Sequence, residues 1–281
     1  MITVESIVDD ILAEGKKYID NKVGRYHDWA DTPTHKSFMV EYAFPKDVAP
    51  FYCNDKPLPN IDVVKKEGIV CWGLTNLMLR GAGVPLPSVK KCKSYKDSKG
   101  PCMGDTDDIG FGVGGSDEWL YLFADKVELW KKYLDDPELT LPKGTLLLRN
   151  FDDLTGGHTA ILAEDSKPNQ LMEARVIHSA GEGLSDNQNV NEEPIGNQEK
   201  MFKVKYRKWD TGRNYPNLLC ESPYYHAVLR PEHYIDVEEV KKERERYAKL
   251  AEKEAKREGT IANLLSLMGG NEKDNNINIR F

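Results

Sequence analysis

The sequence has no excess of positive charge and no long apolar run. Its 281 residues carry 39 Lys and Arg against 46 Asp and Glu, a net charge of −7. Proteins that depend on a nucleic-acid backbone need clustered positive charge, so the composition argues against a nucleic-acid partner. No apolar run approaches the roughly 18 residues of a membrane-spanning helix, and the mean hydropathy is −0.59. We therefore expect a water-soluble protein with no transmembrane segment.

The sequence also lacks a Cys-x-x-Cys pair and a basic N-terminal segment. Without that pair, neither a zinc knuckle nor a thioredoxin-type redox site is indicated. The first ten residues carry acids where a secretory signal would need bases. We expect free thiols in a reducing compartment: a cytoplasmic protein, or one that a virion carries or a non-classical route delivers. The cysteines are odd in number and cannot all pair within the chain: Cys53, Cys71, Cys92, Cys102 and Cys220.

Two motifs that suggest a ligand lack the context that such a site requires. The glycine-rich run 110–115 has no strand before it and no βαβ unit after it, which a dinucleotide site would need. Asp105, Asp107 and Asp108 lack the spacing of an EF-hand loop, so a solvated acidic loop is expected there. We predict no cofactor and no metal.

Apolar periodicity predicts helices at the start, in the middle and at the end of the chain. A helix is predicted over residues 3–20, with Thr3 as its N-cap. A second helix is predicted to begin at Cys71 and to stop at the glycines after residue 80. A third is predicted over 116–134, and a charged helix over 236–258.

Strand patterns fill most of the second half of the chain. Two short apolar runs separated by a polar loop, residues 158–163 and 171–178, predict an antiparallel hairpin. Residues 30–66 contain five prolines and are interpreted as an insertion, and the polar segment 181–199 as a loop. The remaining predicted strands cover residues 144–149, 201–209 and 225–230.

Cys71 and His158 stand where a thiol hydrolase needs its nucleophile and its base. Cys71 lies at the start of a predicted helix, whose amide dipoles would stabilise a negative sulfur. Gly73 is small enough to allow close approach. His158 opens a predicted strand, a rigid support from which an imidazole can accept the thiol proton.

The sequence around these two residues resembles the NlpC/P60 family of papain-like cysteine hydrolases. The segment 68–87 resembles the family's nucleophile helix, with a cysteine, a glycine, an apolar run and then Ala-Gly-Val-Pro-Leu-Pro. Residues 142–147 resemble its Pro-Gly-Asp-Leu strand entry, and 158–163 the strand that carries the catalytic histidine. Residues 24–29 resemble the aromatic stretch that precedes the nucleophile. The order Cys then His is that of this family.

The resemblance implies an α+β fold, a papain-like domain with N-terminal helices packed on an antiparallel sheet. We expect this domain over residues 1–235, with insertions at about 30–66 and 88–140. Residues 236–281 would form a charged helical and disordered tail. The tail helix 236–258 and the apolar patch 261–268 are candidates for docking a protein partner.

The resemblance implies further site residues, and two alternatives remain for the third catalytic member. Glu173 would lie near His158 across the hairpin if the chain turns around Lys167, as in Cys-His-Glu CHAP amidases. His178 instead matches the family's Ile-His-Ala motif. The two are an odd number apart and face opposite sides of one strand, so only one can serve, and we favour Glu173. The backbone N–H of Cys71 and the Tyr26 hydroxyl would stabilise the oxyanion.

These residues predict a cysteine peptidase or amidase that cleaves a peptide or amide bond, such as one in a cell-wall peptide. Acyl transfer through the same thiol is one alternative. An inactive structural or interaction protein, such as a phage or virus component, is the other. The second alternative is motivated by Val70 and Trp72, which replace the Asp and Ser that the family commonly has, and by the charged tail helix with its apolar patch.

Overall fold

The computed structural model describes residues 1–24, 58–67, 69, 71–86, 119–120, 123, 125–149, 158–180, 190–202 and 225–268. Tyr26, most of the expected insertion 30–66 and most of the strand expected over 201–209 lie outside the described residues. The chain divides into two units, residues 1–240 and 241–281. The domain boundary expected at residue 235 lies five residues before this division.

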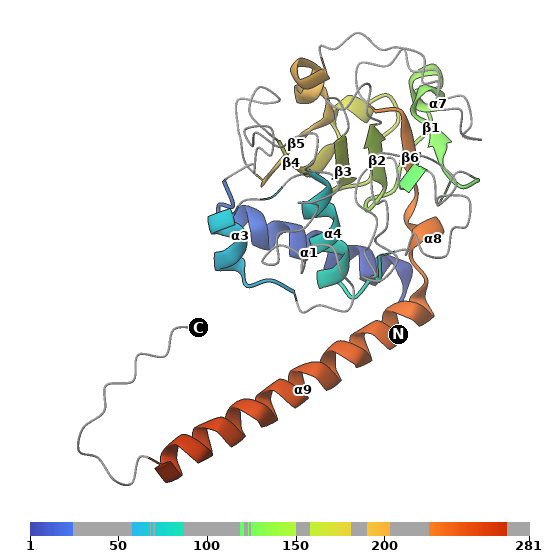
Figure 1. Cartoon of the computed structure of the whole chain (residues 1–281). Coiled ribbons are helices and arrows are strands. Elements are labelled where there is room, and N and C mark those ends of the chain that lie inside the picture. The colour runs from blue at the N-terminus through green and yellow to red at the C-terminus, as the bar shows by residue number, and fades with distance from the viewer. Residues whose placement is uncertain are drawn as a thin grey trace, which may run out of the picture. The chain divides into compact units, whose positions relative to one another are not determined.

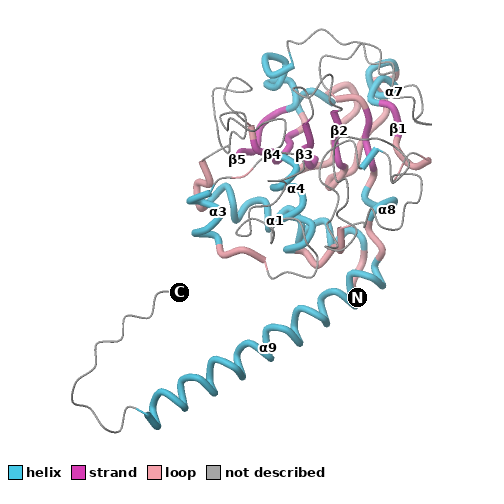
Figure 2. The backbone as a smooth tube through the Cα atoms, in the orientation of Figure 1, coloured by secondary structure: helices cyan, strands magenta, loops and turns pink. Residues whose placement is uncertain are grey.

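The described residues form an α+β structure with one antiparallel sheet (Figures 1 and 2). Its helices are α1 (Val4–Asp20), α3 (Ile61–Glu67), α4 (Cys71–Gly81), α7 (Trp130–Asp135), α8 (Pro231–Tyr234) and α9 (Val237–Met268). Two 3-10 helices are η4 (Leu171–Glu173) and η5 (Ile195–Phe202). The strands are β1 (Glu128–Leu129), β2 (Leu146–Arg149), β3 (His158–Leu162), β4 (Arg175–Ser179), β5 (Val190–Pro194) and β6 (Ala227–Leu229).

The six strands pair in the order β1-β6-β2-β3-β4-β5, and every pairing is antiparallel. In the β3–β4 hairpin, Ile161 lies opposite Ile177. On the other side of β3, Arg149 of β2 lies opposite His158. The antiparallel sheet and its general α+β class confirm the class predicted from the sequence.

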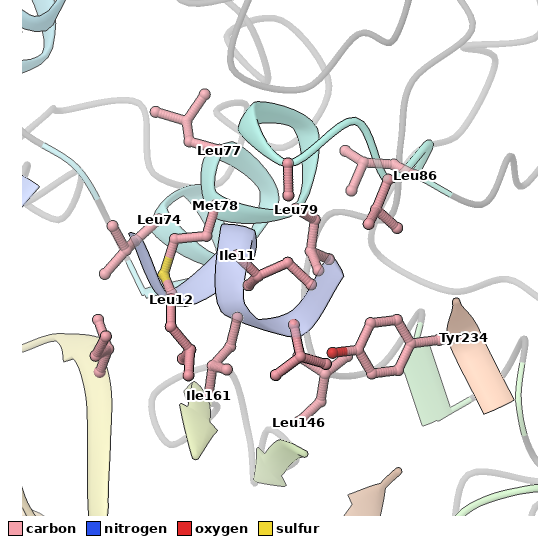
Figure 3. Close-up of a cluster of buried hydrophobic side chains, with 14 of the residues drawn as sticks. Ile11, Leu12, Leu74, Leu77, Met78, Leu79, Leu86, Leu146, Ile161 and Tyr234 are labelled. Carbon is pink, nitrogen blue, oxygen red and sulfur yellow. The ribbon is translucent and has the colours of Figure 1, made fainter. Parts of the chain in front are cut away.

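The sheet has two apolar faces because side chains alternate along each strand. One face packs against α1 and α4, as Figures 1 and 3 show, and the other packs against α7 and the segment before β6. The helix-covered face includes Leu146, Leu148, Ile161, Ile177 and Leu229. The second face includes Leu147, Ala160, Leu162, Val176 and Val228.

Helix α1 begins where its sequence predicts. Thr3 is the N-cap, and its hydroxyl accepts from the Ser6 N–H while the Ser6 hydroxyl accepts from the Thr3 N–H. This reciprocal pair satisfies two backbone donors that the first turn would otherwise leave unpaired. Gly15 lets the helix approach α4 and β4 closely, since a Cβ there would lie 2.6 Å from Met78 Cε and 2.9 Å from Ile177 Cδ1.

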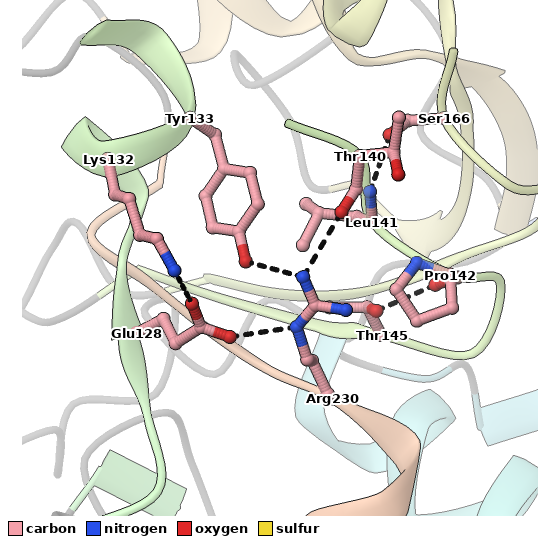
Figure 4. Close-up of polar contacts among 9 residues, drawn as sticks. All are labelled: Glu128, Lys132, Tyr133, Thr140, Leu141, Pro142, Thr145, Ser166 and Arg230. Atoms are coloured by element: carbon pink, nitrogen blue, oxygen red, sulfur yellow. Dashed lines mark hydrogen bonds and ion pairs between the residues drawn. The ribbon is translucent and has the colours of Figure 1, made fainter. Parts of the chain in front are cut away.

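A polar network ties the first strand of the sheet to the chain that follows β6 (Figure 4). Arg230 donates from Nε to Glu128 Oε1 at 2.8 Å. Its Nη2 donates to the Tyr133 hydroxyl at 2.9 Å and to the Thr140 carbonyl at 3.1 Å. Lys132 Nζ contacts the second Glu128 oxygen at 2.5 Å. A planar guanidinium can hold three acceptors in a fixed geometry, so these contacts orient α7 against β1.

The single helix predicted over 116–134 is wrong. The chain is helical at Trp119 and Leu120 but extends at 128–129 to form β1, and α7 follows. Strand β1 pairs with β6, with Glu128 opposite Val228. This contact joins residues a hundred positions apart, and it overrides a helical pattern that is purely local.

Other boundaries also differ from the prediction. The strand expected over 171–178 begins at Arg175, because 171–173 form η4. The loop expected over 181–199 contains β5 and the start of η5. The charged helix expected over 236–258 is α9, which continues to Met268. Within the described ranges, no helix is long and apolar enough to cross a membrane.

Candidate functional site

Three side chains from neighbouring strands form a continuous polar line in the sheet. His158 Nε2 lies 2.9 Å from His178 Nδ1, and the two rings meet edge to face with an interplanar angle of 86°. The other nitrogen of His178, Nε2, lies 2.8 Å from Glu193 Oε1. The line runs from β3 through β4 to β5, so three consecutive strands each contribute one member.

Strand register explains why these side chains meet. His158 and His178 occupy the same face as Ala160 and Val176, their neighbours two positions away. His178 lies opposite Asn191 of β5, and Glu193 is two residues further along the same face. Diagonal neighbours in a sheet are within reach of long side chains, so the Glu193 carboxylate can contact the His178 ring.

The two imidazoles are removed from water. His178 is fully buried, and His158 is only 2% exposed. Burial lowers the pKa of His158 well below its ordinary value, and the adjacent His178 and the Arg149 guanidinium lower this pKa further. Arg149 is itself buried and lies opposite His158 across the β2–β3 pairing. His158 is therefore a neutral imidazole at pH 7.

Cys71 is the first residue of α4, and the start of this helix is attached to the strands that carry the histidines. The Thr75 hydroxyl is 3.3 Å from the hydroxyl of Thr159, the residue after His158. The Ser179 hydroxyl, next to His178, donates to the Ile69 carbonyl at 2.7 Å. These two contacts lie on either side of Cys71 in the sequence, so they fix the start of α4 against β3 and β4.

Tyr225 adds an aromatic wall to the site. Its ring stacks on His158 with centroids 6.3 Å apart, and it meets Trp130 edge to face. Its hydroxyl donates to Gln198 Oε1 at 2.5 Å. Burial raises the pKa of Tyr225, and the Gln198 hydrogen bond opposes this rise. Cys71 and Glu193 add to the rise, so both lie near the ring that stacks on His158.

Of the two alternatives, the structure brings His178 next to His158 and leaves Glu173 apart from it. His178 contacts His158 directly, whereas Glu173 is exposed at the end of η4. The register sets Leu162 opposite Val176, so Glu173 lies near the far end of β3 from His158. The expectation that Glu173 lies beside His158 is therefore wrong. Tyr26, the expected oxyanion donor, lies outside the described residues.

Three residues of this region were not predicted from the sequence: Arg149, Glu193 and Tyr225. Arg149 ends an apolar strand, where a charged residue is ordinarily taken as the strand's exposed limit. Glu193 belongs to Val-Asn-Glu-Glu-Pro, which has none of the apolar alternation that indicates a strand. The only signal for Tyr225 is its place at the start of the predicted strand 225–230.

The described residues include no group of three or more His, Cys, Asp or Glu side chains arranged to hold a metal ion. Comparisons of the chain with protein-family models, with curated proteins and with solved structures found no match.

The buried histidines make stability depend on pH. Burial, aided by Arg149, lowers the pKa of His226 from 6.5 to about 3. Below pH 6.5 the unfolded chain therefore binds a proton that the folded chain does not, so stability is full above that pH and falls as the pH drops. We expect His226→Gln to remove up to about 1.4 kcal/mol per pH unit from this slope between pH 6 and 4. Urea unfolding across that range measures it.

His233, exposed on α8, supplies the matched control for this test. His233→Gln should keep the pH slope of the unmodified chain. An equal slope in the unmodified chain and in His226→Gln would contradict the assignment of a buried neutral imidazole at position 226.

Proposed function

We propose that this protein is a cysteine hydrolase of the papain-like type that cleaves a peptide or amide bond. The observation that carries the proposal is the direct contact between His158 and His178, whose neighbours in the chain, Thr159 and Ser179, contact the chain around the start of the helix that begins with Cys71. A thiol hydrolase requires a nucleophile, a base and a third group that orients the base. The resemblance of the nucleophile helix and the His158 strand to the NlpC/P60 family supports the same assignment.

In the proposed reaction, Cys71 Sγ transfers its proton to His158 and attacks the carbonyl carbon of the substrate. The backbone N–H of Cys71 donates to the resulting oxyanion, and Tyr26 is proposed as the second donor. Collapse of the tetrahedral intermediate breaks the C–N bond, and His158 returns the proton to the leaving amine. Water, deprotonated by His158, then hydrolyses the thioester and frees the thiol.

The proposed substrate is a cell-wall-type peptide or another amide, which the family resemblance implies. Acyl transfer uses the same thioester, with an amine or alcohol in place of water. Adding an amine acceptor and identifying the products distinguishes the two reactions, because only a transferase gives an acylated amine as the main product.

An inactive protein that keeps the fold is the second candidate. Trp72 favours it, since this bulky residue follows the cysteine where the family commonly has serine, and it packs against the apolar core beside α4. In this case the buried histidine pair would be structural and Cys71 an ordinary buried thiol.

Alkylation of Cys71 distinguishes the two candidates. An activated thiolate reacts with iodoacetamide at about pH 6, whereas an ordinary thiol with a pKa near 8.5 does not. We expect Cys71 to be alkylated faster than Cys220 at that pH, as followed by peptide mass spectrometry. We also expect Cys71→Ala to abolish hydrolysis of peptide or amide substrates. Equal labelling rates together with unchanged turnover in Cys71→Ala would rule out the enzyme.

The third member of the site gives a separate prediction. His178→Ala removes the group that orients His158, so kcat should fall by about 10²–10⁴-fold, the usual contribution of positioned acid–base catalysis. Glu173→Gln should leave kcat unchanged, because Glu173 is exposed and distant from His158 along the hairpin. Steady-state kinetics of the two variants measure the difference. Similar small losses in both would exclude His178 from the reaction.

A further inference from the structure

We propose that Glu193 is a positioning residue that sets the direction of the hydrogen bonds through both imidazoles and so presents His158 Nδ1 as the base. The inference rests on the proposed function of the site, in which His158 accepts the thiol proton. It begins at the solvent-facing end of the polar line, where Glu193 Oε1 lies 2.8 Å from His178 Nε2.

The carboxylate determines which nitrogen of His178 carries hydrogen. An ionised carboxylate can only accept hydrogen bonds, so His178 Nε2 must be the donor in this contact. In the neutral form of His178, Nδ1 then carries a lone pair. That nitrogen faces His158 Nε2 at 2.9 Å, and it accepts the hydrogen bond there.

The hydrogen bond between the rings likewise determines which nitrogen of His158 carries hydrogen. Because His178 Nδ1 accepts, His158 Nε2 must donate and carries the hydrogen. The buried His158 is neutral, so its remaining nitrogen, Nδ1, holds the lone pair that can take a proton. Each ring thus adopts its Nε2–H form. His158 donates to His178 and His178 donates to Glu193, so the carboxylate determines the direction of both hydrogen bonds.

Burial of the two rings strengthens the influence of the Glu193 carboxylate on them. The side chain of Glu193 is 15% exposed, whereas that of His178 is 0% exposed. The carboxylate therefore keeps contact with water, while the two imidazole rings to which it is linked are shielded from water. Burial, His178 and Arg149 disfavour an imidazolium at His158. The Glu193 carboxylate opposes them through His178, because interactions of charges are stronger in such a dry environment.

Without the carboxylate, the hydrogen bonds can run the other way. His178 Nδ1–H would donate to a bare His158 Nε2, and the hydrogen of His158 would then sit on Nδ1. A protonated Nδ1 cannot act as the base for Cys71. The other groups that act on His158 remain in place in such a variant: Arg149 on β2, which lowers its pKa, and Tyr225 before β6, whose ring stacks on it.

The adjacent residue provides a matched control. Glu192 precedes Glu193 in β5 and lies opposite Ile177, on the other face of the sheet. It accepts from Arg175 Nε at 2.7 Å and has no part in the histidine line. Glu192→Gln and Glu193→Gln therefore remove the same charge from the same strand, on opposite faces.

The test is nuclear magnetic resonance of the full chain labelled with ¹⁵N-histidine, at pH 7 and without substrate. Long-range ¹H–¹⁵N correlations report which ring nitrogen carries hydrogen, and the signals are assigned with His158→Gln and His178→Gln variants. We expect Nε2–H forms of both rings in the unmodified chain and in Glu192→Gln. In Glu193→Gln, an Nδ1–H form of His158 should appear. Unchanged ring signals in Glu193→Gln would overturn the proposal.

A second variant and a kinetic measurement cover the case in which Glu193→Gln does not fold and separate this proposal from the proposed function. If Glu193→Gln does not fold, Glu193→Asp withdraws the carboxylate by one carbon and should give a smaller but measurable fraction of the Nδ1–H form. In kinetic assays, Glu193→Gln should lower kcat by about 10–100-fold with KM unchanged, by analogy with the loss of a partner that orients a metal-ligating histidine. If the ring signals follow Glu193 but Cys71→Ala keeps full activity, the proposed function fails, and only the control of the ring hydrogens by Glu193 stands.

Discussion

The antiparallel pairing of β3 with β4 is the constraint on which the rest of the site depends. Because side chains alternate along a strand, this pairing places His158 and His178 on one face of the sheet. It places Thr159 and Ser179 on the other face, where they contact the chain at the start of α4. A shift of one residue in this register would exchange the two sets and separate the histidines from the polar line.

Burial of several polar groups beside an apolar core has an energetic cost that hydrogen bonds must offset. An imidazole or hydroxyl moved from water without a partner costs about 1–3 kcal/mol. Here His178 has a partner at each nitrogen, and Tyr225 donates to Gln198. These hydrogen bonds therefore offset the cost of burying the polar line. The line meets solvent at its outer end, at Glu193.

Much of the fold near the site could be predicted from local sequence. The capping box at Thr3, the start of α4 at Cys71 and the start of β3 at His158 each depend on residues within one turn or one strand. Such signals are strong because the energetics are local. His158 could be placed beside a second polar residue, but the sequence left Glu173 and His178 as alternatives.

The features that could not be predicted depend on contacts between distant segments. Strand β1 forms because it pairs with β6, and β5 forms because it pairs with β4, although neither has a strand-like pattern of its own. The position of Glu193 beside His178 therefore cannot be predicted without knowing that β5 pairs with β4. Glu173 was misplaced because the hairpin turns through residues that include Asn169, with φ of +61°, and η4 delays the start of β4 until Arg175.

We propose that Cys71 and His158 act as a coupled pair, and the pH at which Cys71 ionises tests this coupling directly. Ultraviolet absorbance follows thiolate formation with pH, and subtracting the Cys71→Ser variant isolates the signal of Cys71. We expect Cys71 to ionise at lower pH in the otherwise unmodified chain than in a His158→Gln background, because the imidazolium stabilises the thiolate. Identical titration curves in the two backgrounds would contradict it.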